Sequence, residues 1–278
     1  MKIYDCFTYC GEDELLKIRF KTLHNQVDKF IIIEGNKFFN GVKKKQQFNI
    51  NKFKQYKSKI NYFFIKDFPI HDGNNWKYEY FQRNKISIGL KEAQKDDIIL
   101  ISDADEIPNL TNKDFTKYDS TIFLQKMYYY KLNIVCYKGL KFKDKWAGTK
   151  SCKFKFFDTA QKVREFRVKT YPWWRIDRKM NRYLEYNGGW HFAYLMSSEQ
   201  ISKKLLRFSH EIKHVLQKKK VNIKKFSNKK NINNKIKNMS DIYGRKNIKL
   251  KVVKIDSSFP KEIHKNIKKY KNLISNFT

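Results

Sequence analysis

Cysteine is scarce in this chain. Cys6, Cys10, Cys136 and Cys152 are scattered through 278 residues and have none of the paired spacing that zinc sites require. Four isolated thiols in a chain of this length also do not form the disulfide framework of a small secreted protein. The simplest expectation is a cytoplasmic protein, because the cytosol keeps thiols reduced.

Long apolar runs are also lacking. No stretch approaches the roughly 20 residues that a membrane-spanning helix needs. Residues 1–10 alternate like a strand and lack the apolar centre of a signal peptide. We therefore expect any contact with a membrane to be peripheral.

Acidic residues are few relative to basic ones. The 27 acidic and 61 basic side chains give a formal charge of +34, which creates a field that favours anionic partners. Such partners are nucleic acid, an anionic membrane surface or a phosphorylated small substrate, although lysine spread along the whole chain is also typical of a genome's compositional bias. We find no nucleic-acid recognition module and expect no specific nucleic acid as partner. A basic nucleic-acid-binding protein with salt-sensitive affinity is the alternative.

Apolar runs and helical periodicity alternate in the first part of the chain. The pattern predicts strands at residues 2–9, 29–36, 61–65 and 98–101, and helices at residues 12–25 and 76–93. Alternation of buried strands with helices predicts an α/β fold with a mixed, mostly parallel central sheet flanked by helices. With 41% hydrophobic residues, the chain has material for a substantial core, and we expect one domain over residues 1–278.

The second part of the chain is less regular. Strands are expected at residues 121–125 and 128–135, within 142–158 and near 187–194, and helices at 198–210 and 259–274. Residues 218–237 are rich in lysine and asparagine and poor in apolar residues, which predicts a mobile surface excursion.

The strand at residues 98–101 has an abruptly acidic end. Asp103, Asp105 and Glu106 follow four aliphatic residues, and Pro108 then ends the strand. While the backbone stays extended, Asp103 and Asp105 point to the same side because strand side chains alternate. Ligands of open α/β sheets bind beyond the carboxyl ends of the strands, and hard oxygen ligands suit Mg²⁺ or Mn²⁺. The alternative is a solvated acidic turn after a core strand.

Two other positions stand out. Glu34 closes the strand at residues 29–36, as the acids close the strand at residues 98–101. His191 follows Gly188 and Gly189, where a backbone without side chains can approach a ligand closely. A histidine among aromatic neighbours is otherwise a core residue with its hydrogen bonds satisfied.

Taken together, these stretches resemble a known family. It is the glycosyltransferase family that includes β-1,4-mannosyl-glycoprotein 4-β-N-acetylglucosaminyltransferase and its bacterial, plant and viral relatives. The matching stretches are Tyr4-Asp5-Cys6-Phe7, Arg19-Phe20, residues 27–34, residues 103–108, Gly189-Trp190-His191 and Ser209-His210.

The resemblance implies a GT-A-type nucleotide-sugar-binding fold. It also implies inverting transfer from a UDP-sugar, with UDP-GlcNAc as the expected donor, to a hydroxyl of a glycan or glycolipid acceptor, with a divalent cation at the diphosphate. A GT-A transferase that uses a different nucleotide sugar, or that is retaining or metal-independent, is a further alternative. Animal members carry a membrane anchor, whereas this sequence starts at its first strand. We therefore expect a cytoplasmic enzyme, peripheral at most to the inner face of a membrane, and do not expect the bisecting reaction itself.

The expected site residues follow from the acidic strand end and the resemblance. Asp105 is the expected direct metal ligand, Asp103 binds the metal, a metal-bound water or the ribose, and His191 binds the metal or donates to the diphosphate. Glu34 is expected at the uridine, and positive charge at the phosphates is expected from Arg83, Lys204 and His210.

Inverting transfer also needs a base for the acceptor hydroxyl, preferably a carboxylate on the side opposite the leaving group. Asp177 and Glu211 are the expected candidates, with Glu165 and Glu185 also available. Asp177 is preferred because it follows the aromatic pair Trp173-Trp174.

Overall fold

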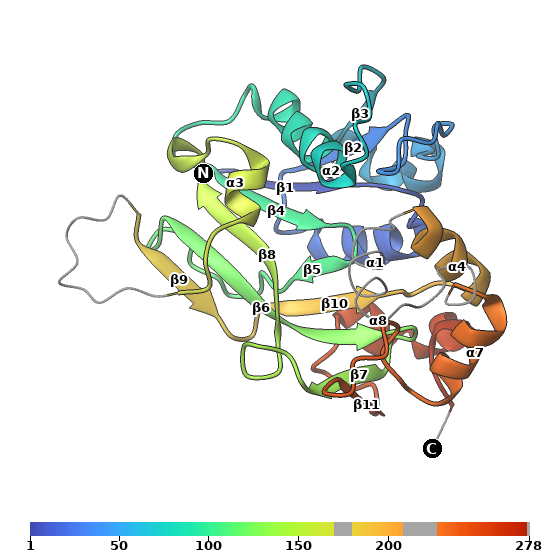
Figure 1. The fold of residues 1–278 in the computed structure, drawn as a ribbon. Helices are drawn as coiled ribbons and strands as arrows, with labels where there is room; N and C mark the ends of the chain where they lie inside the picture. The colour runs from blue at the N-terminus through green and yellow to red at the C-terminus, as the bar shows by residue number, and fades with distance from the viewer. Residues whose placement is uncertain (170–179, 208–226, 277–278) are drawn as a thin grey trace.

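The structure is a computed structural model that describes residues 1–169, 180–207 and 227–276. It is a mixed α/β fold with one large sheet and helices on its faces (Figure 1). The strands are β1 (Ile3–Thr8), β2 (Lys29–Gly35), β3 (Ile60–Ile65), β4 (Ile98–Asp103), β5 (Glu106–Pro108), β6 (Ser120–Tyr129), β7 (Ile134–Lys138), β8 (Trp146–Lys153), β9 (Arg182–Glu185), β10 (Gly189–Ala193) and β11 (Lys249–Val252).

The helices connect or cover these strands. They are α1 (Asp13–Leu23), α2 (Asn75–Asn84), α3 (Ala160–Arg164), α4 (Ser198–Arg207), α7 (Lys229–Lys237) and α8 (Lys261–Lys265). Segments of 3₁₀-helix lie at Ile50–Lys59, Lys85–Leu90, Phe154–Phe156 and Ile267–Leu273.

The sheet has a parallel part and a mixed part. Strands β4, β1, β2 and β3 are parallel neighbours, and β8 joins β4 in the antiparallel sense. Beyond β8, strand β6 pairs antiparallel with β8 and β7, and parallel with β9 and β10. The predicted α/β fold with a mixed central sheet flanked by helices is confirmed. Parallel pairs join β4, β1, β2 and β3 and also join β6 to β9 and β10, whereas the other pairs of the described strands are antiparallel, so the sheet as a whole is not mostly parallel as predicted.

The central strands are buried on both faces, as their unbroken aliphatic runs predict. Ile98 and Leu100 pack with residues of α1, while Ile99 and Ile101 pack with residues of α3 and the Lys85–Leu90 segment. Figure 1 shows α2 and α3 on one side of β1 and β4 and α1 on the other. The strand that carries the acids is therefore an interior strand of the sheet.

Several predicted elements differ from the structure. The single helix expected at 76–93 is α2 followed by a 3₁₀ segment. Strand β6 includes the strand expected at 121–125 and the first two residues of the one expected at 128–135, whose remainder is a turn and the start of β7. The helix expected at 259–274 is the short α8 followed by a 3₁₀ segment. Within the predicted surface excursion, residues 229–237 form α7. The helix is held because Ile232 is fully buried in a hydrophobic cluster with residues of β6 and α4.

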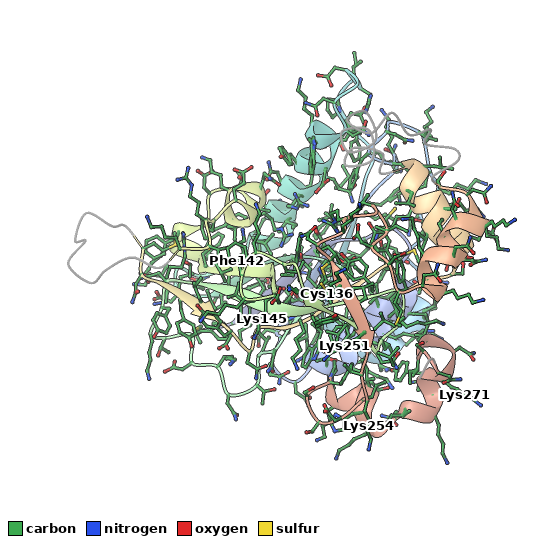
Figure 2. All side chains as sticks on the ribbon, turned by 60° about the horizontal axis from the view of Figure 1, so that its bottom comes forward. Cys136, Phe142, Lys145, Lys251, Lys254 and Lys271 are labelled. Atoms are coloured by element: carbon green, nitrogen blue, oxygen red, sulfur yellow. The ribbon has the colours of Figure 1, made fainter. Side chains whose placement is uncertain are left out.

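Lysine covers much of the surface. Figure 2 shows the side chains of Lys251, Lys254 and Lys271 projecting outward around β11 and the C-terminal segment. Across residues 1–169, 180–207 and 227–276, no helix combines the length and the apolar character needed to cross a bilayer.

Candidate active site

The acidic segment after β4 is a turn that a buried arginine holds in place. Strand β4 ends at Asp103, residues Ala104 and Asp105 form the turn, and β5 begins at Glu106. Arg19, on α1 and fully buried, donates hydrogen bonds to the backbone carbonyls of Asp103 and Glu106 at 3.1 and 2.8 Å. The prediction that the backbone stays extended from Asp103 to Asp105 is therefore wrong, because the chain turns at residues 104–105 and enters β5.

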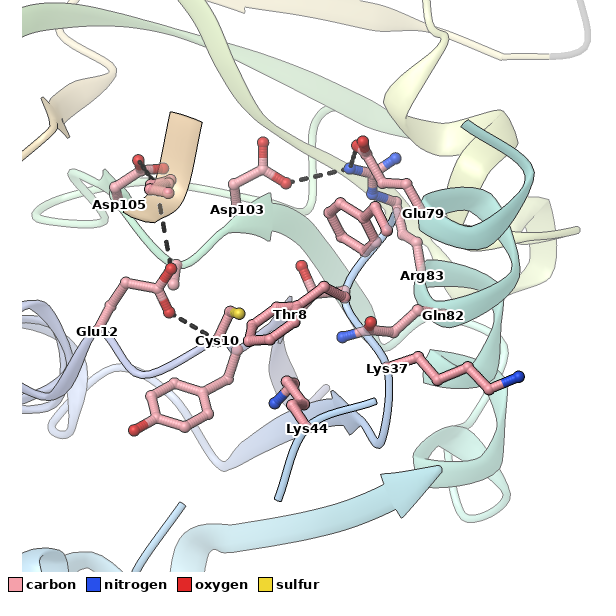
Figure 3. Close-up of a pocket in the computed structure, with 15 residues that line it drawn as sticks. Thr8, Cys10, Glu12, Lys37, Lys44, Glu79, Gln82, Arg83, Asp103 and Asp105 are labelled. Carbon is pink, nitrogen blue, oxygen red and sulfur yellow. Dashed lines mark hydrogen bonds and ion pairs between the residues drawn. The ribbon is translucent and has the colours of Figure 1, made fainter. Parts of the chain in front are cut away.

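Both aspartate side chains nevertheless line one cleft, which we call the Asp103 cleft. It lies at the carboxyl ends of the parallel strands, because Thr8 of β1 pairs with Asp103 of β4 and both chains leave the sheet at this edge. Its walls come from residues 8–12, residues 37–44, α2 and α4, and it encloses about 190 Å³. Figure 3 shows Glu79 and Arg83 of α2 on one side of Asp103, and Glu12 and Asp105 on the other.

Asp103 lies between two arginines. Its carboxylate oxygens are 3.2 Å from Arg83 and 3.2 Å from Arg164, and its side chain remains 40% exposed. Partial burial raises the pKa of Asp103, but the charges of Arg164 and Arg83 outweigh this and hold the pKa below its ordinary value. Arg83 also pairs with Glu79 at 2.5 Å. Asp103 is therefore ionised and accessible from the cleft.

Glu106 is buried next to Asp103 and fixes the position of the Asp103 backbone. Its carboxylate is fully buried and accepts hydrogen bonds from Arg164 at 2.7 Å, from the Trp146 indole at 2.7 Å and from the Asp103 backbone at 3.1 Å. A buried carboxylate with this many donors is held in a single orientation. Arg164 thus ties Glu106 and Asp103 together from the end of α3.

Asp105 belongs to a second group of charges. One carboxylate oxygen is 3.6 Å from Nε2 of His191, the other is 3.8 Å from Nζ of Lys204, and Lys204 is 4.0 Å from Glu12. Burial raises the pKa of Asp105, but His191 and Lys204 outweigh it, so the pKa is lowered. Burial lowers the pKa of His191 and of Lys204, but in each case Asp105 outweighs it and the pKa is raised.

Backbone packing places His191 beside Asp105. Strand β10 lies between β5 and β6, and a Cβ on Gly189 would come within 2.3 Å of the Ile107 carbonyl oxygen. On Gly188 it would come within 2.4 Å of the Leu124 nitrogen. The two glycines thus allow the backbone at the start of β10 to pack closely against β5 and β6. From the sequence, we expected them to allow a ligand to approach the backbone. Among the described residues, the buried Nδ1 of His191 has no hydrogen-bond partner.

The comparison with known proteins decides the family. A sequence model described as glycosyltransferase family 17 matches residues 1–275. The chain belongs to glycosyltransferase family 17. No curated protein matches it. The resemblance inferred from the sequence is therefore confirmed, and the mixed α/β fold is that of a glycosyltransferase.

The structure of this family 17 glycosyltransferase gathers five predicted site residues. Asp103, Asp105, Arg83 and Lys204 line the Asp103 cleft, and His191 contacts Asp105. Their roles stay predictions. Asp177, His210 and Glu211 lie outside the residues that the structure describes.

Glu34, whose role at the uridine stays a prediction, makes its contacts within the protein. Its side chain is fully buried and pairs with Lys44, and it accepts hydrogen bonds from the backbone of Gln47 and Phe48 and from the Tyr62 hydroxyl at 2.8 Å. Because both carboxylate oxygens are occupied by the protein, Glu34 fastens residues 44–48 to β2 in this structure and does not line the Asp103 cleft.

The two other carboxylates considered as bases lie apart from these residues. Glu185 is buried against Lys113 at 2.6 Å, in a separate pocket beside Tyr183. Glu165, at the end of α3, is exposed and accepts a hydrogen bond from Gln161 at 2.9 Å. Neither lines the Asp103 cleft.

Four residues of the family 17 site were missed from the sequence. Glu12, Glu79, Arg164 and Trp146 surround Asp103, Asp105 and Glu106 in space, but they come from four different elements. Burial raises the pKa of Glu12 and of Glu79, so both carboxylates hold protons more readily than exposed ones. The available signal for Glu12 was its position just after the first strand, at the same edge of the sheet as Asp103.

Proposed function

We propose that this family 17 glycosyltransferase transfers a sugar, with N-acetylglucosamine expected, from a UDP-sugar to a hydroxyl of a glycan or glycolipid acceptor. The observation that carries the proposal is the Asp103 cleft itself, where two ionised aspartates, Arg83 and Lys204 meet at the carboxyl ends of the parallel strands. This edge of an α/β sheet is where such folds bind nucleotides. The expected stereochemical outcome is inversion at the anomeric carbon.

A divalent cation fits the charges of the cleft. Asp103, Glu79 and Glu106 share two arginines, Arg83 and Arg164, which leaves one surplus carboxylate. Near Asp105, the two carboxylates of Asp105 and Glu12 contact one lysine, Lys204. When His191 is neutral, this group therefore also carries one more negative than positive charge. A bound Mn²⁺ or Mg²⁺ would offset this surplus.

The donor set agrees with a metal held jointly by protein and substrate. No group of three or more histidine, cysteine, aspartate or glutamate side chains in residues 1–169, 180–207 and 227–276 is placed to hold an ion. Mg²⁺ is commonly held by one or two carboxylates together with substrate phosphates, rather than by a cage of protein ligands. Asp105 would hold the cation, with Asp103 or His191 beside it. When bound, the cation supplies Lewis-acid stabilisation of the diphosphate.

The chain's own cations support the leaving group. Cleavage of the bond from the anomeric carbon to the diphosphate passes through an oxocarbenium-like state and leaves negative charge on the phosphate oxygens. Arg83 and Lys204 both line the cleft, and each is already oriented by a carboxylate, Arg83 by Glu79 and Lys204 by Asp105. Fixed positive groups of this kind stabilise charge where it develops. The proton of the acceptor hydroxyl goes to a base, for which Asp177 and Glu211 stay predictions.

The test is release of UDP from a panel of UDP-sugars with and without Mn²⁺. We expect release with Mn²⁺ and its loss in Asp105→Ala with the fold intact. The matched control is Asp96→Ala, because Asp96 is a half-exposed acid paired with Lys155 at the opposite end of β4. Near-normal release by Asp105→Ala, or no binding or turnover of any UDP-sugar by the unaltered chain, contradicts the proposal.

A further inference from the structure

A second cleft adjoins the Asp103 cleft, and we call it the aromatic cleft. It encloses about 380 Å³ and shares Phe39, Glu79, Arg83, Asp103 and Lys204 with the Asp103 cleft. Asp103 and Arg83 therefore lie at the border between the two clefts. Anything bound in the aromatic cleft lies beside whatever Asp103 and Asp105 hold.

Five aromatic side chains distinguish this second space. Trp76, Tyr80, Trp146, Tyr194 and Tyr243 line it, and they come from α2, β8 and the segments after β10 and α7. None of the five was assigned to the site from the sequence. Such a concentration of rings next to a charged centre points to a ligand that has both apolar faces and polar edges.

The rings are held at defined positions. Trp76 and Tyr80 are one helical turn apart on α2, with ring centroids 6.0 Å apart, and Trp76 is 39% exposed. The Trp146 indole is fixed by its hydrogen bond to Glu106 at 2.7 Å. On the opposite wall, the hydroxyls of Tyr194 and Tyr243 are 2.7 Å apart. The cleft is therefore built from oriented rings with one accessible indole.

Polar groups lie between these rings. Glu79, Gln161 and Arg164 line the same cleft, and Arg83 joins Glu79 to Asp103. A pyranose ring matches this pattern, because its C–H face stacks on an aromatic ring while its hydroxyls need hydrogen-bond partners at the edges. A purely apolar ligand would cover these charged groups and remove them from water without offering hydrogen bonds in return, which is costly.

We propose that the aromatic cleft binds the acceptor as a pyranose unit, with Trp76 as the ring on which the sugar stacks. The inference rests on the proposed function, because a sugar in this cleft is an acceptor only if the Asp103 cleft holds the nucleotide sugar. The inference assigns pyranose acceptors to the aromatic cleft, with its five aromatic side chains as the groups that bind them. Its central claim is that Trp76 contributes to affinity for the acceptor and not to affinity for UDP.

The experiment measures two binding events on the same protein. UDP with Mn²⁺ is titrated first by calorimetry, and the UDP-saturated chain is then titrated with a panel of p-nitrophenyl pyranosides. The variants are Trp76→Ala, Trp76→Phe and the control Tyr183→Ala. Tyr183 is 38% exposed, close to the value for Trp76, but stacks on Tyr118 in a separate pocket.

We expect at least one pyranoside to bind the unaltered chain and to bind Trp76→Ala about tenfold more weakly, which corresponds to the loss of one stacking contact. Trp76→Phe should keep most of the affinity because it keeps a ring, and Tyr183→Ala should equal the unaltered chain. Affinity for UDP should be the same in all four proteins.

Two results overturn the inference: no pyranoside of the panel binds, or the pyranosides bind Trp76→Ala as tightly as the unaltered chain. Failure of the proposed function gives a different result. In that case UDP does not bind, while pyranoside binding that depends on Trp76 still supports a sugar site in the aromatic cleft.

Discussion

The guanidinium group of Arg19 and the carboxylate of Asp5 form a bidentate pair with both side chains fully buried. The Arg19 nitrogens lie 2.7 and 2.5 Å from the two Asp5 oxygens. The same guanidinium group donates to the Ser102 hydroxyl and to the backbone carbonyls of Asp103 and Glu106. One buried ion pair therefore joins α1 and β1 to the turn that presents Asp103 and Asp105.

Replacing Arg19 should destabilise the fold. Arg19→Met leaves Asp5 buried without its partner, and we expect the free energy of unfolding to fall by about 3 to 5 kcal/mol. The double variant Arg19→Met/Asp5→Leu should recover much of this loss because no unpaired charge remains, but not the rate of UDP release, because the turn has lost its donors. Urea denaturation and UDP release measure the two effects. A single variant within about 1 kcal/mol of the unaltered chain would contradict the role of the pair.

Arg164 should be needed for both stability and activity. Because Glu106 is fully buried, Arg164→Ala leaves it short of a positive partner, and we expect a loss of about 3 kcal/mol together with slower UDP release. Arg164→Lys should recover only part, because one ammonium group does not reproduce the fork that reaches Glu106 and Asp103. The control is Lys162→Ala on the same helix, whose side chain is 64% exposed. Equal stability of Arg164→Ala and the control would disprove the assignment.

Glu34 should affect folding and not the affinity for UDP. Glu34→Gln weakens the contacts to Lys44, Gln47, Phe48 and Tyr62, and we expect a loss of about 1 to 3 kcal/mol in the free energy of unfolding. Calorimetry under conditions where the variant is folded should give the same affinity for UDP as the unaltered chain. Weaker binding of UDP at unchanged stability would instead support the uridine contact predicted from the sequence.

Lys150 should make stability depend on pH in the alkaline range. Burial, and after it the charge of Arg164, lowers the pKa of Lys150 from 10.5 to about 8. Between these two values the unfolded chain binds more protons than the folded chain, so the free energy of unfolding contributed by Lys150 rises with pH. Urea denaturation of the unaltered chain and of Lys150→Met from pH 7 to 10 should give a steeper rise for the unaltered chain. Parallel curves would show that the lysine is not perturbed.

The sequence predicts those parts of the fold that depend on local patterns. β2 and β4 follow from unbroken apolar runs and β1 from its strand-like alternation. The position of Asp103 at the end of β4 follows from the run at residues 98–101. Helix α7 was missed because a single buried residue, Ile232, anchors a segment whose composition is otherwise that of a surface loop. The boundaries of β6 and β7 were missed because residues 128–135 carry an unbroken strand pattern, although a turn at residues 130–133 separates the two strands.

The site was predictable only in part, because its partners meet through the tertiary fold. Asp103 and Asp105 are marked by their place after a buried strand. Arg164, which contacts Asp103, lies 61 residues further along the chain. The contacts of Glu34 were not predictable, because an acid at a strand end looks the same in the sequence whether it faces a ligand or fastens a loop. Only the contacts to Lys44 and Tyr62 separate the two cases.

The most direct measurement for the central claim is a crystal soaked with Mn²⁺ and UDP, with anomalous scattering used to locate the manganese. The account predicts a manganese peak about 2 Å from a carboxylate oxygen of Asp105 and from the diphosphate of UDP, with the nucleotide in the Asp103 cleft. A manganese peak remote from both Asp103 and Asp105, or UDP bound elsewhere on the chain, would contradict the account.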